Sequence, residues 1–406
     1  MRLLQINVVV NSGSTGRIAE GIGQVAMENG WESYIAFGRE HERPSKSHKI
    51  RIGTDWDIKM HGVQTRVLDN HALGISSRSA TKEFIKEIEQ IKPDVIHLHN
   101  VHGYYINVEV LFNYLSKLDT PVVWTFHDCW PFTGHCAYFD YAGCDKWKTG
   151  CYECPLKKSY PASFVIDRSK KNYEDKKRLF NSVKNITLVP VSDWLGNYFK
   201  DSFLHKYNVR MIHNGIDTSV FQPKENNPSI DKYNLTDKFV ILGVASIWGF
   251  RKGLQDFIKM NETISSHHQI VLVGLSDKQI KELPDNIIGI ARTESVNELA
   301  DLYSAADVFV NPTYEDNFPT TNLEALACGI PVITYNTGGS PEAVDTDTGI
   351  VVEKGNTDAL IDAINEIKQK GKAHYSDACV SRAHRLYRKE DRFKEYIDLY
   401  GEVMKH

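Results

Sequence analysis

Hydrophobic runs typical of β-strands alternate with stretches of helical periodicity through the first half of the chain. The runs rich in β-branched and aromatic residues cover residues 2–10, 33–37, 94–99, 121–126 and 186–191. Residues 15–29 and 81–91 are predicted helices, and in the second Phe84, Ile88 and Ile91 lie on one face at helical spacing. This alternation predicts a parallel sheet covered by helices.

The same alternation begins again in the second half. Further strand candidates cover residues 239–246, 269–274, 287–290, 307–311, 331–335 and 350–352. Residues 214–237, rich in Asn, Pro, Asp and Lys, are typical of a linker. We therefore predict an α/β protein of two doubly wound, Rossmann-like domains, 1–213 and 214–389, with a C-terminal helix at 390–406 that returns to the first. Two such domains facing each other would form a cleft at the carboxyl ends of both sheets, where ligands bind.

Composition narrows the class of protein. Of 406 residues, 41% are hydrophobic and 25% charged, as in ordinary globular proteins. The net charge is 48 − 52 = −4, which argues against a nucleic-acid partner. No apolar run reaches the roughly 18–20 residues of a membrane helix, and the N-terminus reads as a strand rather than a signal peptide. We expect a cytoplasmic protein, with peripheral attachment to the inner face of the plasma membrane left open.

A glycine-rich turn, residues 11–16, follows the first predicted strand. Gly13 and Gly16 would let the backbone approach a ligand at the start of the next helix. The spacing matches neither the dinucleotide-binding fingerprint nor a P-loop. Phosphate contact and a plain tight turn both remain open.

The segment 311–333 carries two acids in a pattern that indicates a binding site. We expect Asn317 to cap a helix that has Pro319 in its first turn. Asp316 then lies in the preceding loop and Glu324 inside the helix, among apolar residues. A buried carboxylate needs donors, which the vicinal hydroxyls of a ribose would supply. The first amide groups of this helix, at Thr320 and Thr321, would be free to hold a diphosphate.

This segment, together with 337–342, resembles glycosyltransferase family 4. Six further pieces follow in the order that family shows: residues 13–16, 94–99, 125–128, 190–193, 214–217 and 252–253. The resemblance implies the GT-B fold and a retaining, metal-independent transferase that uses a nucleotide sugar. It also implies that Asp316 holds hydroxyls of the donor sugar and that Glu324 holds the ribose. Two positions depart from the family pattern: Asp316 replaces the usual Glu, with Glu315 beside it, and Pro319 replaces the usual Gly.

The resemblance also assigns the remaining candidates. His127 would lie beside the transferred sugar, and Lys252 would bind the diphosphate. Residues 246–248 replace the Gly-Arg that the family usually has before this Lys, and Arg251 would supply the missing guanidinium; the alternative is that Arg251 and Lys252 are a solvated basic pair. The predicted catalytic residues are His127, Lys252 and Asp316; the predicted donor-binding residues are Gly16, Arg251, Lys252, Asp316, Thr320, Thr321 and Glu324; the acceptor-side candidates are Gly13, His99, His102 and Asp128. The first domain would bind the acceptor and the second the donor.

The function that follows is transfer of a hexose from a UDP- or GDP-sugar to a glycan or lipid-linked oligosaccharide in surface polysaccharide biosynthesis. No catalytic cofactor is needed. The alternatives are a non-catalytic protein that binds sugar nucleotides or glycans on the same fold, and a zinc-stapled nucleic-acid binder, against which the net charge argues.

Five of the seven cysteines lie between Cys129 and Cys154, in an insertion at 129–160. The spacing of Cys136, Cys144, Cys151 and Cys154 predicts structural zinc, with free thiols or disulfides as alternatives. The aromatic side chains of the same insertion suggest a binding surface; they are Trp130, Phe132, Tyr138, Phe139, Tyr141, Trp147 and Tyr152. Residues 157–184 then hold nine basic and three acidic side chains. They form either a solvated helix face or a contact with anionic lipid or a lipid diphosphate.

Overall fold

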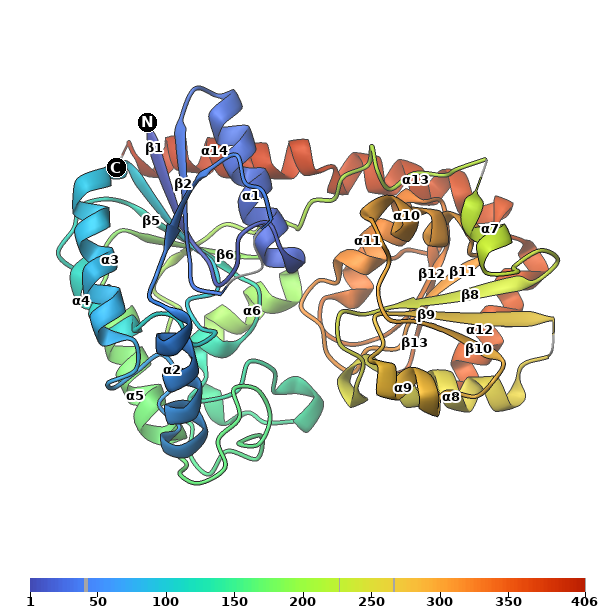
Figure 1. Cartoon of the computed structure of the whole chain (residues 1–406), viewed down its shortest axis with the longest axis horizontal. Coiled ribbons are helices and arrows are strands. Elements are labelled where there is room, and N and C mark those ends of the chain that lie inside the picture. The colour runs from blue at the N-terminus through green and yellow to red at the C-terminus, as the bar shows by residue number, and fades with distance from the viewer. Residues whose placement is uncertain (40–42, 226, 266, 406) are drawn as a thin grey trace. The chain divides into compact units, whose positions relative to one another are not determined.

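The structure is a computed structural model that describes residues 1–39, 43–225, 227–265 and 267–405. The chain divides into two compact units (Figure 1). Unit 1 comprises Met1–His213 and Arg392–His406, and unit 2 comprises Asn214–Asp391. Each unit is a parallel sheet with helices on both faces, as the alternation of strand and helix patterns predicts.

The sheet of unit 1 has seven strands in the order β3-β2-β1-β4-β5-β6-β7, and every neighbouring pair is parallel. The strands are β1 (Arg2–Ile6), β2 (Glu32–Phe37), β3 (His48–Arg51), β4 (Val95–Leu98), β5 (Val122–Phe126), β6 (Ile186–Pro190) and β7 (Asn208–Val209). This is the doubly wound order, which reverses direction between β1 and β4. The helices are α1 (Gly13–Glu28), α2 (Asp55–Leu68), α3 (Arg78–Ile91), α4 (Val108–Leu115), α5 (Ser169–Phe180), α6 (Asp193–Asp201) and α14 (Lys389–Val403).

Helix α14 starts in unit 2 and ends in the core of unit 1. Its side chains Phe393, Tyr396, Leu399 and Tyr400 are buried in one cluster with core residues of the sheet and of α1. Gly21 of α1 makes room for this packing, because a Cβ there would lie 2.2 Å from the Phe393 ring. The Tyr400 hydroxyl also lies 2.6 Å from Nδ1 of His97 in β4. The described part of the predicted helix 390–406 thus packs on the first sheet, and His406 lies outside the described residues.

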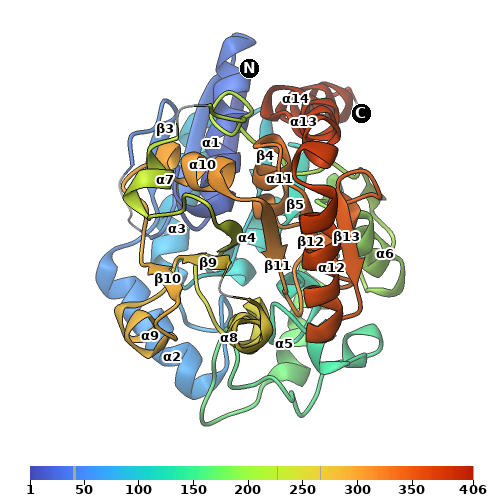
Figure 2. The ribbon, with the colours of Figure 1, turned by 90° about the vertical axis from the view of Figure 1, so that its right-hand side faces the viewer.

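Unit 2 repeats the architecture with a six-stranded parallel sheet in the order β10-β9-β8-β11-β12-β13 (Figure 2). The strands are β8 (Phe239–Val244), β9 (His268–Val273), β10 (Ile287–Ile290), β11 (Val308–Asn311), β12 (Val332–Tyr335) and β13 (Gly349–Val352). The helices are α7 (Pro228–Lys232), α8 (Leu254–Thr263), α9 (Asp277–Glu282), α10 (Val296–Ala305), α11 (Thr320–Ala327), α12 (Thr357–Lys370) and α13 (Ala373–Tyr387). The segment 214–237, interpreted as a linker, belongs to this unit and contains α7.

The insertion at 129–160 folds into short 3-10 turns that surround an aromatic core. The ring of Trp147 lies 5.3 Å from that of Phe132 and 5.2 Å from that of Phe139, and all three rings are buried. Tyr198 and Phe199 of α6 pack against the same rings. The interpretation of these aromatic side chains as a binding surface is therefore wrong for most of them, because they hold the insertion onto unit 1.

The basic stretch 157–184 is not one solvated face. Lys176 on α5 is buried, and its ammonium donates to the carbonyl oxygens of Trp130 and Thr133 at 2.7 and 3.0 Å. The same ammonium lies 3.4 Å from the centroid of the Trp130 indole. Burial lowers the pKa of Lys176 to about 7. Within the described ranges, no helix is both long and apolar enough to cross a bilayer.

Candidate functional site

The loop after β11 and helix α11 hold the predicted donor-side acids. The N-cap of α11 is Pro319, and the helix begins at Thr320, so the expectation that Asn317 caps it is wrong. Pro319 ends the loop in an extended conformation that a proline readily adopts. Thr320 and Thr321 are thereby the first two helical residues, whose amide groups lack partners within the helix.

Glu324 lies in the middle of α11 and is only 7% exposed, as its apolar neighbours predict. The hydroxyl of Tyr303 on α10 donates to its Oε2 at 3.1 Å. A buried carboxylate requires such a donor. Tyr303 was not predicted as a site residue, because it lies 21 residues from Glu324 on a different helix.

Lys252 and Asp316 form an ion pair in unit 2. Each side chain is 18% exposed. Burial would raise the pKa of Asp316, but the charges of Lys252 and Arg251 outweigh it and hold that pKa below its usual value. Burial lowers the pKa of Lys252, and Asp316 opposes this shift. Each group therefore favours the charged form of the other, and the ammonium of Lys252 is fixed next to the loop.

The turn around Lys252 is locked onto the loop by close backbone contacts. Arg251 donates from Nη1 to the carbonyl oxygen of Glu315 at 2.7 Å. Gly253 has φ +72°, and a Cβ there would lie 2.2 Å from the carbonyl oxygen of Pro312. Lys252 and Arg251 are thus part of a packed turn, which does not fit the alternative of a solvated basic pair. Glu315 is fully buried, whereas Asp316 faces Lys252.

The glycine pair after β12 fixes the backbone of Asp316. The amide of Gly339 donates to the carbonyl oxygen of Asp316 at 3.0 Å. Gly338 has φ +58°, and a Cβ there would lie 1.9 Å from that same oxygen. The segment 337–342 therefore contacts the predicted donor loop directly, and only glycine fits at its second position.

In unit 1, His127 follows β5 and His99 follows β4. His99 Nδ1 lies 3.1 Å from His127 Nε2, and His99 Nε2 lies 3.0 Å from Oε1 of Gln5 in β1. Because Gln5 uses its Nε2 to donate to Ala19 O at 2.7 Å, its Oε1 accepts from His99. Neutral His99 then accepts at Nδ1, so His127 carries its proton on Nε2.

Burial lowers the pKa of His127 to about 4, and burial also lowers the pKa of His99. Both rings are therefore neutral near pH 7, and Nδ1 of His127 is unprotonated. Gln5 was not predicted as a site residue, because it is fully buried and lies 94 residues from His99 along the chain.

His102 and Asp128 form a second polar group of unit 1. His102 Nε2 lies 2.8 Å from Asp128 Oδ2, and His102 Nδ1 lies 2.9 Å from the hydroxyl of Tyr160. Asp128 Oδ1 also accepts from the amide of Trp130 at 2.9 Å. Burial would raise the pKa of Asp128, but His102 and this amide outweigh it and keep the carboxyl ionised.

The glycine-rich turn forms the start of α1. Gly13 is the first helical residue, with φ +59°. Gly16 packs against the turn, because a Cβ there would lie 3.1 Å from Cγ2 of Val9. The N-cap Ser12 makes no side-chain capping bond to the helix. These contacts explain both glycines as parts of a tight turn, and the geometry is equally compatible with phosphate at the helix start.

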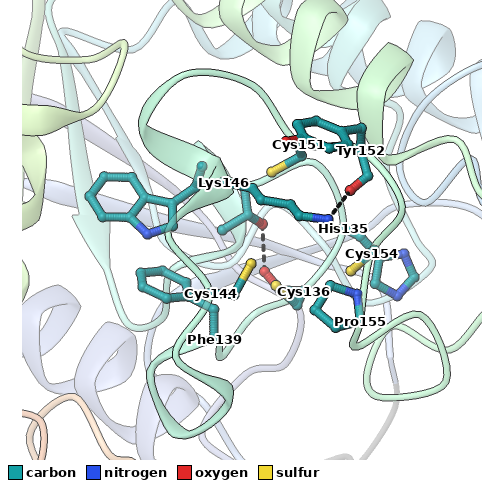
Figure 3. Close-up of a pocket in the computed structure, with 11 residues that line it drawn as sticks. His135, Cys136, Phe139, Cys144, Lys146, Cys151, Tyr152, Cys154 and Pro155 are labelled. Atoms are coloured by element: carbon teal, nitrogen blue, oxygen red, sulfur yellow. Dashed lines mark hydrogen bonds between the residues drawn. The ribbon is translucent and has the colours of Figure 1, made fainter.

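The four predicted zinc ligands line one small pocket in the insertion (Figure 3). Cys136 is buried; Cys144, Cys151 and Cys154 are partly exposed, and all four are free thiols. Among the residues that the structure describes, no three His, Cys, Asp or Glu side chains are grouped as metal ligands. The geometry therefore does not support the predicted zinc site.

The thiols of that pocket interact with one another instead. A hydrogen bond from Cys136 is the main cause that lowers the pKa of Cys154 to about 7, and the same bond raises the pKa of Cys136. Cys151 accepts from the amide of Gly134 at 3.1 Å, and burial raises its pKa to about 11.

Two family models match the chain. The model described as Glycosyltransferase Family 4 matches residues 24–220, and the model described as Glycosyl transferases group 1 matches residues 238–370. A putative colanic acid biosynthesis glycosyl transferase of Escherichia coli, WcaC, is 24% identical, covering 98% of this chain and 99% of its own length. The capsular polysaccharide biosynthesis glycosyltransferase CapM of Staphylococcus aureus is 31% identical over 38% of this chain and 43% of its own length.

Solved structures match the whole chain. A sucrose-phosphate synthase from Thermosynechococcus elongatus has a TM-score of 0.76 at 18% identity, covering 100% of this chain and 99% of that chain. Anabaena HepE in complex with UDP-glucose has a TM-score of 0.70 at 13% identity, covering 99% of this chain and 100% of that chain. At these identities the likeness concerns the fold alone.

Proposed function

Because the chain belongs to glycosyltransferase family 4 and has the GT-B fold, we propose that it transfers a hexose from a UDP- or GDP-sugar to a glycan or lipid-linked oligosaccharide, with retention. Relatives named for colanic acid and capsular polysaccharide biosynthesis support a role in making a surface polysaccharide. The likeness to a protein solved with UDP-glucose supports a nucleotide-sugar donor. Unit 2 would bind the donor and unit 1 the acceptor.

The observation that carries the proposal is the charged Lys252–Asp316 pair beside the start of α11. In the proposed reaction the bond between C1 of the sugar and the diphosphate oxygen breaks, and the acceptor oxygen bonds to C1 on the same face. The leaving phosphate takes the acceptor proton, so no separate base is needed. Lys252 and the amide groups of Thr320 and Thr321 would stabilise the negative charge that develops on the diphosphate.

The other residues would position the sugar. Asp316 would accept hydrogen bonds from sugar hydroxyls, and Glu324 from the ribose. Unprotonated Nδ1 of His127 would accept from a further hydroxyl of the transferred sugar. His99, His102, Asp128 and Gly13 remain candidates for the acceptor side, and Gly16 and Arg251 for the donor side. No step in this scheme uses a metal ion.

The experiment is a panel of UDP- and GDP-sugars, with release of free nucleotide and formation of product as readouts. We expect one donor to turn over and Glu324→Ala to lose about a hundredfold in kcat/KM or more, as for a buried bidentate contact. The matched control is Glu366→Ala, which removes an exposed carboxylate of the same unit. Donor binding without turnover on any acceptor would favour the alternative of a non-catalytic binding protein.

We further propose that the protein acts in the cytoplasm at the inner face of the plasma membrane, where a lipid-linked acceptor would be presented. Binding to RNA or DNA is not expected at a net charge of −4. Sedimentation of the protein with anionic vesicles, compared with a nucleic-acid binding assay at the same salt, tests this placement.

A further inference from the structure

Helix α2 carries apolar side chains on its solvent side. The exposed members are Trp56, Met60, Val63 and Val67. These positions are spaced i, i+4, i+7 and i+11, and at about 100° per residue they fall within about 60° of one another on the helix. Trp56 is 68% exposed and Val63 is 53% exposed. A continuous apolar stripe of this kind on a surface indicates an interaction site.

The stripe is not the side of α2 that packs on the core of unit 1, because the opposite side of the helix is the buried one. His61, Gly62 and Thr65 face the domain and are buried. His61 Nε2 accepts from the amide of Ala72 at 2.9 Å, which fixes that side against the following loop. A capping box formed by Thr54 and Asp57 begins the helix. The helix is therefore held by its inner face, while Trp56 and Val63 on the opposite side are more than half exposed.

Residues 164–166 extend the stripe. The amide of Phe164 donates to the carbonyl oxygen of Arg66 at 2.8 Å, and that of Ile166 donates to the carbonyl oxygen of Val67 at 3.2 Å. Phe164, Val165 and Ile166 are all exposed. Two segments about a hundred residues apart thus form one apolar surface, which we call the α2 patch. Figure 1 shows the position of α2 in the ribbon.

Basic side chains flank the α2 patch. Lys59 and Arg66 are exposed on one flank of the stripe, and Lys158, which follows Lys157 in the chain, is also exposed. Lys157 donates to the carbonyl oxygen of Val165 at 3.3 Å, so its ammonium lies at the edge of the patch. Four cations around an apolar surface match the charge of an anionic bilayer.

The nearby acids are engaged within the protein. Asp55 pairs with Arg51 at 2.5 Å, and Asp57 accepts from the amide and hydroxyl of Thr54. Asp167 accepts from the amides of Cys154 and Ser169. These contacts hold the three carboxylates against the protein, whereas Lys59, Arg66 and Lys158 are exposed.

We infer that the α2 patch inserts its apolar side chains into the headgroup region of an anionic bilayer, with α2 lying along the surface and the flanking cations contacting lipid phosphates. A convex stripe with basic flanks is suited to lipid, which needs no complementary groove. The inference deepens the proposed peripheral attachment and rests on it for the choice of lipid as partner. It places the contact on α2 and residues 157–166 instead of on the helix that carries Lys176.

The patch is tied to the acceptor-side residues by buried contacts within unit 1. Asp69, the C-cap of α2, binds His135 Nδ1 at 2.5 Å and the amide of Arg168 at 2.7 Å. Two residues later, His71 Nε2 accepts from the amide of Gly103, next to His102, at 3.0 Å. A bilayer bound to the patch would therefore lie at a fixed distance from the ends of β4 and β5, which suits an acceptor held in the membrane.

Tryptophan emission tests the inference, because Trp56 is the most exposed of the seven tryptophans. We expect phosphatidylcholine vesicles that contain phosphatidylglycerol to bind the protein and shift its emission to the blue, and brominated lipid to quench it. Trp56→Phe should keep the binding and lose most of the shift and quenching. Val63→Asp combined with Val165→Asp should weaken binding about tenfold or more, since apolar contact is replaced by like charge.

Val209→Asp is the matched control, because Val209 is exposed on the edge strand β7 of the same unit and lies outside the α2 patch. Its binding should equal that of the wild type. Without vesicles, the double variant should release nucleotide from the donor at the wild-type rate, with a soluble acceptor or with water as the acceptor. The vesicle test is therefore separate from the test of transferase activity. Three results would overturn the inference: equal binding to pure phosphatidylcholine, no quenching by brominated lipid, or dimerisation through Val63 in place of vesicle binding.

Discussion

Replacing Lys176 by Met should change how the stability of unit 1 depends on pH. The ammonium of Lys176 is buried between α5 and the insertion, where it donates to the carbonyl oxygens of Trp130 and Thr133. Its pKa of about 7 compares with 10.5 for the same group in water. Below pH 7 the group is protonated in both the folded and the unfolded state, so folding carries the cost of burying a charge.

Between pH 7 and 10.5 the folded state holds Lys176 neutral while the unfolded state keeps the proton. The unfolded state then binds more protons, and the free energy of unfolding rises with pH by about 1.4 kcal/mol per unit. Between pH 7.5 and 9.5 this amounts to about 3 kcal/mol, and over the whole window to about 5 kcal/mol. In Lys176→Met this contribution is absent, and the loss of two hydrogen bonds adds a cost of about 1–3 kcal/mol at every pH.

The assay is urea unfolding followed by tryptophan fluorescence in a Trp248→Phe background. Trp248 is the only tryptophan of unit 2, so the remaining six report on unit 1. The difference between the two proteins should grow by about 3 kcal/mol from pH 7.5 to 9.5. Neighbouring cysteines are present in both proteins, so their own titration cancels in the difference to first order.

Lys177→Met, on the exposed side of the same helix, should show no such pH dependence. The reasoning would be refuted if the difference in free energy of unfolding between the wild type and Lys176→Met stayed constant within about 1 kcal/mol from pH 7.5 to 9.5, because Lys176 would then titrate as it does in water.

Two further substitutions test the packing of each unit. Gly338→Ala should raise KM for the donor about tenfold or more, because its Cβ displaces the backbone of Asp316. Gly371→Ala is the control, since Gly371 also has a positive φ (+80°) but no atom lies within 4 Å of its Cβ, and it should leave donor kinetics unchanged. Equal losses in the two variants would mean that backbone strain alone is responsible. Phe393→Ala should lower the free energy of unfolding of unit 1 by about 3–5 kcal/mol in the fluorescence assay. Lys394→Ala, on the exposed side of α14, should change it little, and a similar loss there would contradict the assigned packing.

The sheet of each unit follows from the sequence because its central strands are buried on both faces and read as continuous apolar runs. Expected and observed bounds differ mostly at the ends, as for β1, which stops at Ile6 rather than Val10. The edge strands β3 and β7 were not predicted, because their residues are mostly polar and partly or fully exposed. Helix α2 was missed for a related reason: apolar residues on its outer side obscure the periodicity of its inner face.

The candidate site was predictable where neighbours in sequence are also neighbours in space. Asp316, the start of α11 and Glu324 follow from one local pattern of strand, loop and helix. The partners supplied by other elements could not be read in this way, since nothing local links Gln5 to His99 or Tyr303 to Glu324. Which side chains of the insertion are buried could not be predicted from the sequence either, because an irregular segment has no periodicity that separates buried from exposed positions.

The path of α14 has a consequence for synthesis on the ribosome. The core of unit 1 includes Phe393 and Tyr400, yet the 178 residues of unit 2 (214–391) are made between the last strand of unit 1 and these side chains. At about 5–20 residues per second this interval lasts roughly 10–35 s. During that time the apolar positions that α14 will cover, such as Val95 and Val123, lack their partner. We therefore expect nascent unit 1 to expose these positions until the second unit has been translated, so that its folding is completed only after unit 2 has been made.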